Sequence, residues 1–426
     1  MPKFACLPQS YTFRRSLRPA PACAILFSMQ YEEKQIQYPP VHPGTDRTFI
    51  RFYSGAIDLN AVFYASAARD AASSGDAAPM RVFVTDDTVA ALPALRHFIG
   101  LFHDKDGGKT LAPGFVGERG RDILVVLASG ESAKTIESVL SVVAAALDYN
   151  AQRSAVFVGI GGGVITDMTA FAASIFKRGA HCELVPTTLL SMVDAAIGGK
   201  TGCDFQSYKN MIGSFFPAQK IHIFPAFVQS LPQDQYRSGL AEAVKTALLY
   251  DAALVEKLEA TPEVLTDRTL PLVDEMIRSC VSAKAAVVEQ DLTEKNIRMQ
   301  LNLGHTFGHA LESRAGLGTV SHGDAVAWGM ARAATLSEQL GLCHSDFEDR
   351  VKRLLARFGW ETGALHSALS DRYADEAEAA RALYEAMKKD KKNATARVRF
   401  VLQRGVADTV ITEVDEKDVL AALQHD

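Results

Sequence analysis

Three histidines and one glutamate in the second half of the chain have the side chains that a catalytic metal site needs. Glu242 lies in RSGLAEAVK, His305 and His309 stand four residues apart in LNLGHTFGHALE, and His322 opens HGDAVAWGM. One carboxylate with two or three imidazoles is the usual ligand set of a catalytic zinc site with an open position. Two histidines at i and i+4 alone are about as often structural, but the whole set favours a metal. The sequence leaves open whether His309 or His322 is the third ligand.

Charged and polar side chains that could hold an anionic polyol occur near these residues and in an earlier segment. Lys245 follows Glu242 by one helical turn. The earlier segment, VPTTLLSMVDAAIGGKTG followed by KNMIGSFF, contains Asp194, Lys200, Lys209 and Asn210. Its Gly-Gly-Lys-Thr string is not a P-loop, because Asp194 stands where the first glycine of that motif is required. The set suits a phosphorylated or carboxylated polyol, and the alternative is an ordinary solvated surface.

A glycine-rich segment, GIGGGVITD at 159–167, directly follows an apolar run. Glycines at a strand-to-helix turn let the backbone approach a pyrophosphate, and free N–H groups at the helix start favour its charge. The spacing is not GxGxxG, because Val164 occupies the place of the third glycine. Alone, such a turn is a tight connection about as often as it is a nucleotide site.

Short apolar runs alternate with helical patterns in the first half, and together they must position these residues. Buried strands are predicted at 81–85, 123–127, 155–160 and 182–185. An amphipathic helix is predicted at 133–149, with its apolar stripe at Ile136, Val139, Leu140, Val143 and Leu147. This alternation predicts an α/β fold with a parallel sheet, helices on both faces and ligands at the carboxyl ends of the strands.

The character of the chain changes after the run IHIF at 221–224. From about residue 231 it is rich in Ala, Leu, Glu and Lys, and the next β-type run is VRFVL at 398–402. We therefore predict a mostly helical second domain that begins near residue 230.

Composition excludes several classes of protein. The 426 residues are 48% hydrophobic and 22% charged, which is typical of a globular protein and not of a disordered one. No apolar run approaches the ~18 residues that cross a bilayer. A net charge of -5 argues against nucleic acid as the main partner. The six cysteines are scattered, which favours reduced thiols in a cytoplasmic protein.

The first thirty residues differ in charge from the rest of the chain. Up to Gln30 the chain carries Lys3, Arg14, Arg15 and Arg18 but no acidic residue. This is typical of a transit-type presequence, and the alternative is a start assigned too early, with Met29 as the true initiator. We predict that residues 1–45 are an N-terminal extension, either disordered or, in the first 28 residues, not translated.

Taken together, the strings resemble the 3-dehydroquinate synthase family of the sugar-phosphate cyclase superfamily. The resemblance runs over roughly residues 80–410, in order, through GGGVITDMTAFAASIFKRG, VPTTLLSMVDAAIGGKTG, KNMIGSFF, RSGLAEAVK, LNLGHTFGHALE, HGDAVAWGM and KDKKNATARVRFVL. It implies a Rossmann-like NAD-binding domain at 46–230 and a helical metal- and substrate-binding domain at 231–426. The active site is then expected in the cleft between them, and the family suggests a homodimer.

The resemblance also implies roles, position by position. The metal ligands, for Zn²⁺ or Co²⁺, would be Glu242, His305 and His322, with His309 as an acid/base group. The other catalytic residues would be Asp194, Lys200, Lys245 and Lys284. The substrate-binding residues would be Arg178 (on the phosphate), Lys209, Asn210, Arg298, Asn302 and, in preference to Lys391, Lys392. The NAD-contacting residues would be Asp86, Glu131, Lys134, Gly162, Gly163, Asp167, Thr187 and Thr188.

The implied reaction turns 3-deoxy-arabino-heptulosonate 7-phosphate into 3-dehydroquinate and phosphate, with NAD reduced and reoxidised within each turnover. Some positions depart from the family pattern: Thr166, Ala195–Ala196, the stretch CDFQSY before Lys209, and Asp324. They put the substrate choice in doubt, and not the reaction class.

Three alternatives stay open. The first is a cyclase for sedoheptulose 7-phosphate, although Arg298, Asn302 and the intact LNLGHTFGHALE helix favour the carboxylate-bearing substrate. The second is a metal- and NAD-dependent polyol dehydrogenase, which would release NADH. The third is a pseudo-enzyme that binds NAD as a sensor, which would require broken metal ligands.

Overall fold

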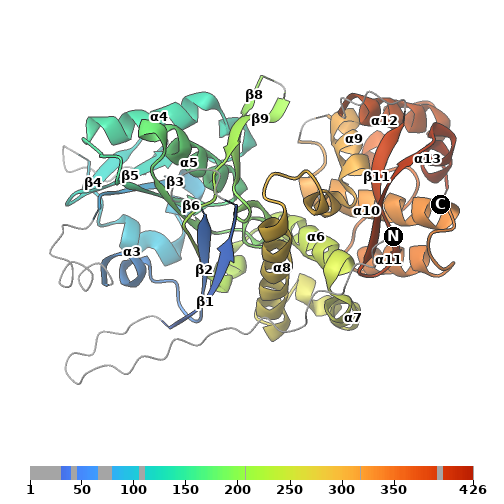
Figure 1. Cartoon of the computed structure of the whole chain (residues 1–426), viewed down its shortest axis with the longest axis horizontal. Coiled ribbons are helices and arrows are strands. Elements are labelled where there is room, and N and C mark those ends of the chain that lie inside the picture. Colours follow the sequence, from blue (N-terminus) through green and yellow to red (C-terminus); the bar gives the residue numbers. More distant parts are fainter. Residues whose placement is uncertain are drawn as a thin grey trace.

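The computed structural model describes residues 30–39, 46–65, 79–104, 111–206, 208–316, 318–390 and 397–425. Within them the first half of the chain forms an eight-stranded sheet in the order β1-β2-β10-β7-β6-β3-β5-β4 (Figure 1). Its strands are β1 Tyr31–Gln37, β2 Arg47–Tyr53, β3 Arg81–Asp86, β4 Val116–Arg119, β5 Asp122–Leu127, β6 Val156–Gly161, β7 His181–Pro186 and β10 Lys220–Ile223.

The centre of this sheet is parallel, as predicted. β3 pairs in parallel with β5 and β6, β6 with β7, and β10 with β7 and β2, whereas β1 and β4 pair antiparallel at the edges. The central strands are continuous apolar runs because helices cover them; every residue of β5 is buried. The predicted α/β fold class is confirmed.

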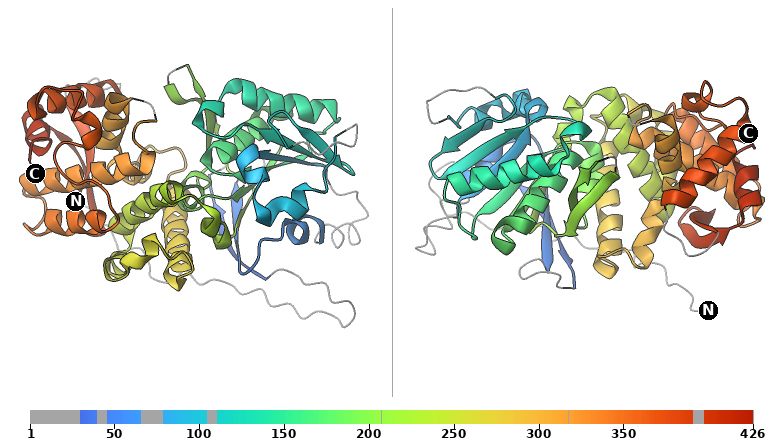
Figure 2. Two further views of the ribbon diagram at one scale, coloured as in Figure 1. Left: turned by 180° about the vertical axis from the view of Figure 1, so that it is seen from behind. Right: turned by 90° about the horizontal axis from the view of Figure 1, so that it is seen from above.

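Two helices, α4 (Ile136–Asp148) and α5 (Gly163–Ile175), lie together over one face of the sheet (Figures 1 and 2). The Thr135 side chain caps α4 by accepting a hydrogen bond from the Ser138 N–H. The helix matches the prediction, but its buried face does not. Leu140 and Leu147 are exposed, and the buried positions are Val139, Val142, Ala145 and Ala146.

The structure adds strands that no sequence pattern predicted. β1, at 31–37, lies within the predicted extension 1–45, so this part of the extension belongs to the sheet; its Ile36 is fully buried. The first 28 residues lie outside the described residues. β8 (Lys200–Phe205) and β9 (Tyr208–Phe215) form a separate antiparallel hairpin that rises from the sheet domain (Figure 1).

The second half is mainly helical, as predicted, and begins with α6 shortly after the domain boundary that we predict at 230. α6 and α8 lie between the sheet and the group of helices α9 to α13 (Figure 1). The helices are α6 Gln233–Tyr250, α7 Ala252–Ala260, α8 Pro271–Gln290, α9 His305–Ala315, α10 His322–Gln339, α11 Phe347–Arg357, α12 Glu376–Asp390 and α13 Glu416–Ala422, with the hairpin β11 Val398–Gly405 and β12 Asp408–Val414.

Two expectations from composition bear on the described residues. None of the helices described there combines the length and the apolar character that a membrane crossing requires. The cysteines in the same residues, Cys182, Cys203, Cys280 and Cys343, are free thiols.

Candidate active site

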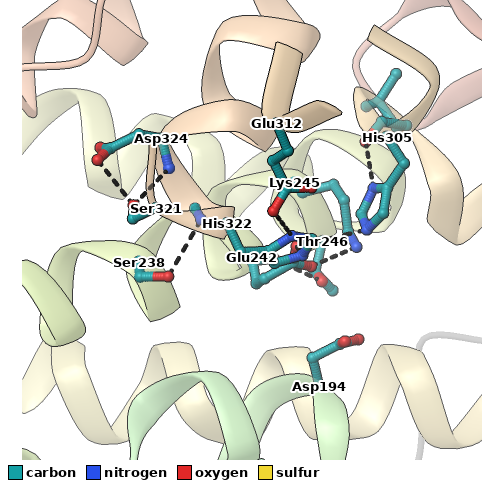
Figure 3. Close-up of polar contacts among 12 residues, drawn as sticks. Asp194, Ser238, Glu242, Lys245, Thr246, His305, Glu312, Ser321, His322 and Asp324 are labelled. Atoms are coloured by element: carbon teal, nitrogen blue, oxygen red, sulfur yellow. Dashed lines mark hydrogen bonds and ion pairs between the residues drawn. The ribbon is translucent and has the colours of Figure 1, made fainter. Parts of the chain in front are cut away.

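Three helices bring the predicted metal ligands together. Glu242 projects from the middle of α6, His305 opens α9 and His322 opens α10 (Figure 3). Each offers one ligand atom, and these atoms all lie within 4.8 Å of one another. His309 is outside this group, although its ring centroid is 5.4 Å from that of His305 and 6.3 Å from that of His322. The geometry therefore favours His322 over His309 as the third ligand.

The environment of Glu242 fits a bound cation. Its side chain is 1% exposed, and neither of its buried carboxylate oxygens has a hydrogen-bond partner. Around it are the Lys245 ammonium, in an ion pair, and the Nε2 atoms of His305 and His322 at 3.8 and 3.5 Å. Burial alone would raise the pKa of Glu242, but Lys245 and the imidazoles hold it well below its usual value. An ionised, buried carboxylate facing two imidazole nitrogens is a donor set that suits Zn²⁺ or Co²⁺.

The start of α10, and with it His322, is fixed against α6. Ser321 caps the helix by accepting a hydrogen bond from the Asp324 N–H at 3.1 Å, and the Gly323 N–H donates to Ser238 Oγ at 3.2 Å. A Cβ at Gly323 would lie 2.3 Å from Ser238 Cα, so only glycine permits this approach. Arg237 donates to Asp324 at 2.7 Å. Asp324, which departs from the family pattern, therefore has a local role in anchoring the helix.

Beside the predicted metal ligands lies a pair of opposite charges, of which the lysine is buried and the aspartate partly exposed. Asp194, in the helical turn η5 (Ser191–Ala195), forms an ion pair with Lys284 of α8, and the Lys284 ammonium also donates to the Asp194 carbonyl at 2.7 Å. Lys284 is 6% exposed. Burial lowers the pKa of Lys284 to about 8, although Asp194 acts in the opposite direction. Lysines and acids thus alternate through the interior, from Asp194 to Glu242.

The lowered pKa of Lys284 makes the stability of the protein depend on pH in a defined direction. Between about 8 and the ordinary lysine value of 10.5 the unfolded chain binds more protons than the folded one, so this group makes folding more favourable as pH rises. The free energy of unfolding of the wild type, relative to Lys284→Met, should therefore increase from pH 8 to pH 10. Urea unfolding of both proteins across this range measures it, and a constant difference would contradict the assigned pKa.

Lys200 and Asn302 meet at a residue that the sequence did not single out. Glu294 forms an ion pair with Lys200 at the start of β8 and accepts a hydrogen bond from Asn302 at 2.7 Å. Its backbone has a φ of +57°, which is uncommon for a non-glycine residue. Nothing in the local pattern marks Glu294, because its two partners are distant in the sequence or in another element. A lone acid in a loop carries no signal of its own.

Arg298 follows Glu294 in the same loop, and its guanidinium donates hydrogen bonds to the backbone of the protein. It is 2% exposed, and its Nη1 donates to the carbonyls of Gly198 at 2.8 Å and Leu292 at 2.5 Å. Gly198 has a φ of +99°, and a Cβ there would lie 2.7 Å from the guanidinium. Arg298 thereby holds the turn that leads into Lys200.

The predicted NAD-contacting residues gather at the carboxyl ends of β3, β6 and β7. Asp86 ends β3, Gly162 and Gly163 begin α5 after β6, and Thr187 follows β7. The chain leaves β3 toward β5 on one side and β6 toward β7 on the other, so these adjacent strand ends form the switch point where such sheets bind ligands. No side chain caps α5 at Gly162. The backbone N–H groups of the first turn of this helix are therefore suited to bind a pyrophosphate.

Lys134 connects this edge to the hairpin. The residue is 4% exposed, and its ammonium donates to Asp167 at 2.8 Å and to Asn210 at 2.5 Å. Two other predicted NAD-contacting residues lie nearby in the sequence of these elements. Glu131 is exposed in the short helical turn before Lys134. Thr188 follows β7, and its hydroxyl is 2.9 Å from that of Ser191. Lys209, next to Asn210, reaches the other way and lies 3.3 Å from Glu312 of α9. The hairpin thus touches both halves of the molecule.

One predicted phosphate-binding residue, Arg178, is not brought to this cluster. Arg178 follows α5, which runs from the carboxyl edge of the sheet to the amino edge, and it lines a separate surface cavity of about 310 Å³ with Arg153, His181 and Gln219. Within one chain the structure does not bring Arg178 to the metal-binding cluster, and its contact with the substrate phosphate stays a prediction. Lys392 lies outside the described residues.

Two family models cover most of this architecture. The model described as 3-dehydroquinate synthase N-terminal matches residues 124–238, and the model described as 3-dehydroquinate synthase C-terminal matches residues 239–393. Among curated proteins, the 3-dehydroquinate synthase of Sulfurovum sp. (strain NBC37-1) is 37% identical over 302 residues, which cover 71% of this chain and 82% of the relative.

Solved structures agree. The 2-epi-5-epi-valiolone synthase of Streptomyces hygroscopicus subsp. jinggangensis, solved with NAD+ and Zn2+ bound, has a TM-score of 0.69 and 28% identity, covering 83% of this chain and 92% of its own. A 2-deoxy-scyllo-inosose synthase complexed with carbaglucose-6-phosphate, NAD+ and Co2+ has the same TM-score at 22% identity, covering 92% and 99%, and shares the fold.

Proposed function

This chain belongs to the 3-dehydroquinate synthase family, and on this premise we propose that it converts 3-deoxy-arabino-heptulosonate 7-phosphate to 3-dehydroquinate and phosphate. It is an NAD- and metal-dependent enzyme. The observation that carries the proposal is the meeting of Glu242, His305 and His322 beside a buried cluster of lysines and acids. Glu242, His305 and His322 would hold Zn²⁺ or Co²⁺, and the glycine turn at Gly162 would receive the NAD pyrophosphate.

The bound groups supply chemistry that side chains lack. When present, NAD offers a reversible hydride acceptor and the divalent metal a Lewis acid that makes a substrate hydroxyl more acidic. The residues of the chain bind and orient. Lys200, Lys209 and Asn210 balance and fix a substrate that carries a carboxylate and a phosphate. Asn302 adds a polar contact beside Lys200.

Protons and buried charges are managed by the same cluster. Lys245 and Lys284 keep Glu242 and Asp194 ionised and restrict how their side chains can turn. His309, whose ring lies next to that of His305, would take or return the proton of a substrate hydroxyl. Asp86 and Lys134 fix the position of the cofactor relative to these groups.

We also propose that the enzyme is a cytoplasmic homodimer. The resemblance gives Arg178 a phosphate contact, yet Arg178 faces a cavity away from the metal-binding cluster. A second copy of the chain is the means by which this arginine could reach a substrate. Free, scattered thiols support a reducing compartment.

One second candidate has an observation in its favour. The 2-epi-5-epi-valiolone synthase whose fold matches at 28% identity belongs to the cyclases, so a heptulose phosphate without the carboxylate must be tested beside the proposed substrate. With NAD and zinc saturating, kcat/KM should be at least about 100-fold higher for 3-deoxy-arabino-heptulosonate 7-phosphate than for sedoheptulose 7-phosphate, because each charge-assisted contact to the carboxylate contributes about 1.5–3 kcal/mol. The reverse order would assign the second substrate.

A further inference from the structure

His322 stands between two carboxylates, one on each ring nitrogen. Its Nε2 is 3.5 Å from Oε1 of Glu242, the proposed metal ligand, and its Nδ1 is 3.7 Å from Oε1 of Glu312. Figure 3 shows Glu312 pointing from α9 toward His322, on the side away from Asp194. The two carboxylates thus face opposite nitrogens of the same ring, and only Glu242 also faces His305.

Glu312 lies on α9, the helix that also carries the proposed metal ligand His305. His305, His309 and Glu312 stand at positions i, i+4 and i+7 of α9, so they share one helix face. The Glu312 side chain is only 14% exposed. Its other ion-pair partner in the described residues is Lys209 of the hairpin, at 3.3 Å. Lys209 is 43% exposed, and so open an ion pair contributes little to holding the carboxylate in place.

Imidazoles that bind metals generally donate their second N–H to a carboxylate or a carbonyl, which fixes the tautomer and raises the basicity of the ligating nitrogen. The other proposed histidine ligand follows this rule, because His305 Nδ1 lies 3.2 Å from the Leu303 carbonyl. For His322, the carboxylate of Glu312 lies in the corresponding place, 3.7 Å from Nδ1.

We propose that Glu312 is a positioning residue of the metal centre: it accepts the Nδ1–H of His322, so that Nε2 faces Glu242 and His305. This inference rests on the metal site of the proposed function. It assigns to the final glutamate of LNLGHTFGHALE a role that neither the spacing of the histidines nor the comparisons give it.

The test measures the zinc affinity of the metal-free full-length protein by competition with a chromogenic chelator at fixed pH. Glu312→Gln should bind zinc about 10- to 100-fold more weakly than the wild type. The matched control is Glu275→Gln, which also removes a carboxylate paired with a lysine, Lys257, on the exposed surface near the start of α8. It should change the affinity by less than about twofold.

Two further variants separate the explanations. Lys209→Met removes the hairpin's contact with Glu312 and should weaken zinc binding at most about fivefold. A loss as large as that of Glu312→Gln would mean that Glu312 acts through the hairpin, which overturns the proposal. Glu312→Asp keeps the charge but withdraws it, and an affinity between wild type and Glu312→Gln is expected. Equal zinc affinity in wild type and Glu312→Gln would also overturn it.

The proposed function and this inference fail in different ways. If the wild type binds no stoichiometric zinc, or if His322→Ala binds it equally well, the metal site itself is wrong. If both behave as expected and only Glu312→Gln is unaffected, the site stands and the role of Glu312 falls. Thermal unfolding of the metal-free variants checks folding, and a shift of the visible bands of the Co²⁺-loaded Glu312→Gln protein is expected as an independent readout.

Discussion

Replacing His322 with alanine should abolish stoichiometric zinc binding and lower phosphate release by about 10³-fold or more. A bound Lewis acid contributes several kcal/mol to stabilising developing charge, and each 1.36 kcal/mol corresponds to a tenfold rate. His322 is one-third exposed at the start of α10, so its removal opens no cavity in the core. Metal content of the dialysed protein and initial rates with added zinc measure both effects.

The control for this variant is His344→Ala, which removes another exposed histidine from the helical half. It should retain metal and rate within about twofold, as surface substitutions usually do. A His322→Ala protein that is both metal-replete and active would remove His322 from the ligand set. His309, whose ring lies 5.4 Å from His305, would then be the remaining imidazole to test.

Lys200→Ala should lower kcat/KM by about 100-fold while the Kd for NAD changes by less than about threefold. The expected loss corresponds to a charge-assisted contact of about 1.5–3 kcal/mol with an anionic group of the substrate. Lys200 is half exposed and is held by Glu294, beside Asn302. Steady-state rates and NAD titration of the same preparation provide the two numbers.

Lys257→Ala is a closely matched control, because Lys257 is also half exposed and also pairs with one glutamate. Its kinetic constants should equal those of the wild type. If Lys200→Ala instead loses NAD affinity, Lys200 belongs to the cofactor site. Such an effect has a structural basis, because Lys200 lines one small cavity with Asp167, a predicted NAD-contacting residue.

The sequence predicted those features that depend on local pattern. The buried strands β3, β5, β6 and β7 are continuous apolar runs, and helices with buried faces follow them. Strand β1 and the hairpin β8–β9 were missed because their residues are largely polar or glycine, so they lack the continuous apolar runs that marked the central strands. The buried face of α4 was also misplaced: Leu140 and Leu147 were expected in the apolar stripe but remain exposed.

The candidate site also contains residues that the sequence predicted and contacts that it could not predict. Motif spacing left His309 and His322 as alternatives, and the family resemblance predicted Glu242, His305 and His322, which the fold brings together from three helices. Pairings across the chain carry no sequence signal, so the contact of Glu294 with Lys200 and that of Glu312 with His322 appear only in three dimensions. For Arg178 the motif gave a role but not a position. Its place in the motif could not predict that α5 carries it to the amino edge of the sheet.

The most direct test of the account is to mix the protein with NAD, zinc and 3-deoxy-arabino-heptulosonate 7-phosphate, and to follow inorganic phosphate and the absorbance of NADH together. Because hydride returns to the substrate within each turnover, we expect one phosphate and one 3-dehydroquinate per substrate with no accumulation of NADH. Steady accumulation of NADH, or the absence of phosphate release from a zinc-loaded protein, would contradict the account.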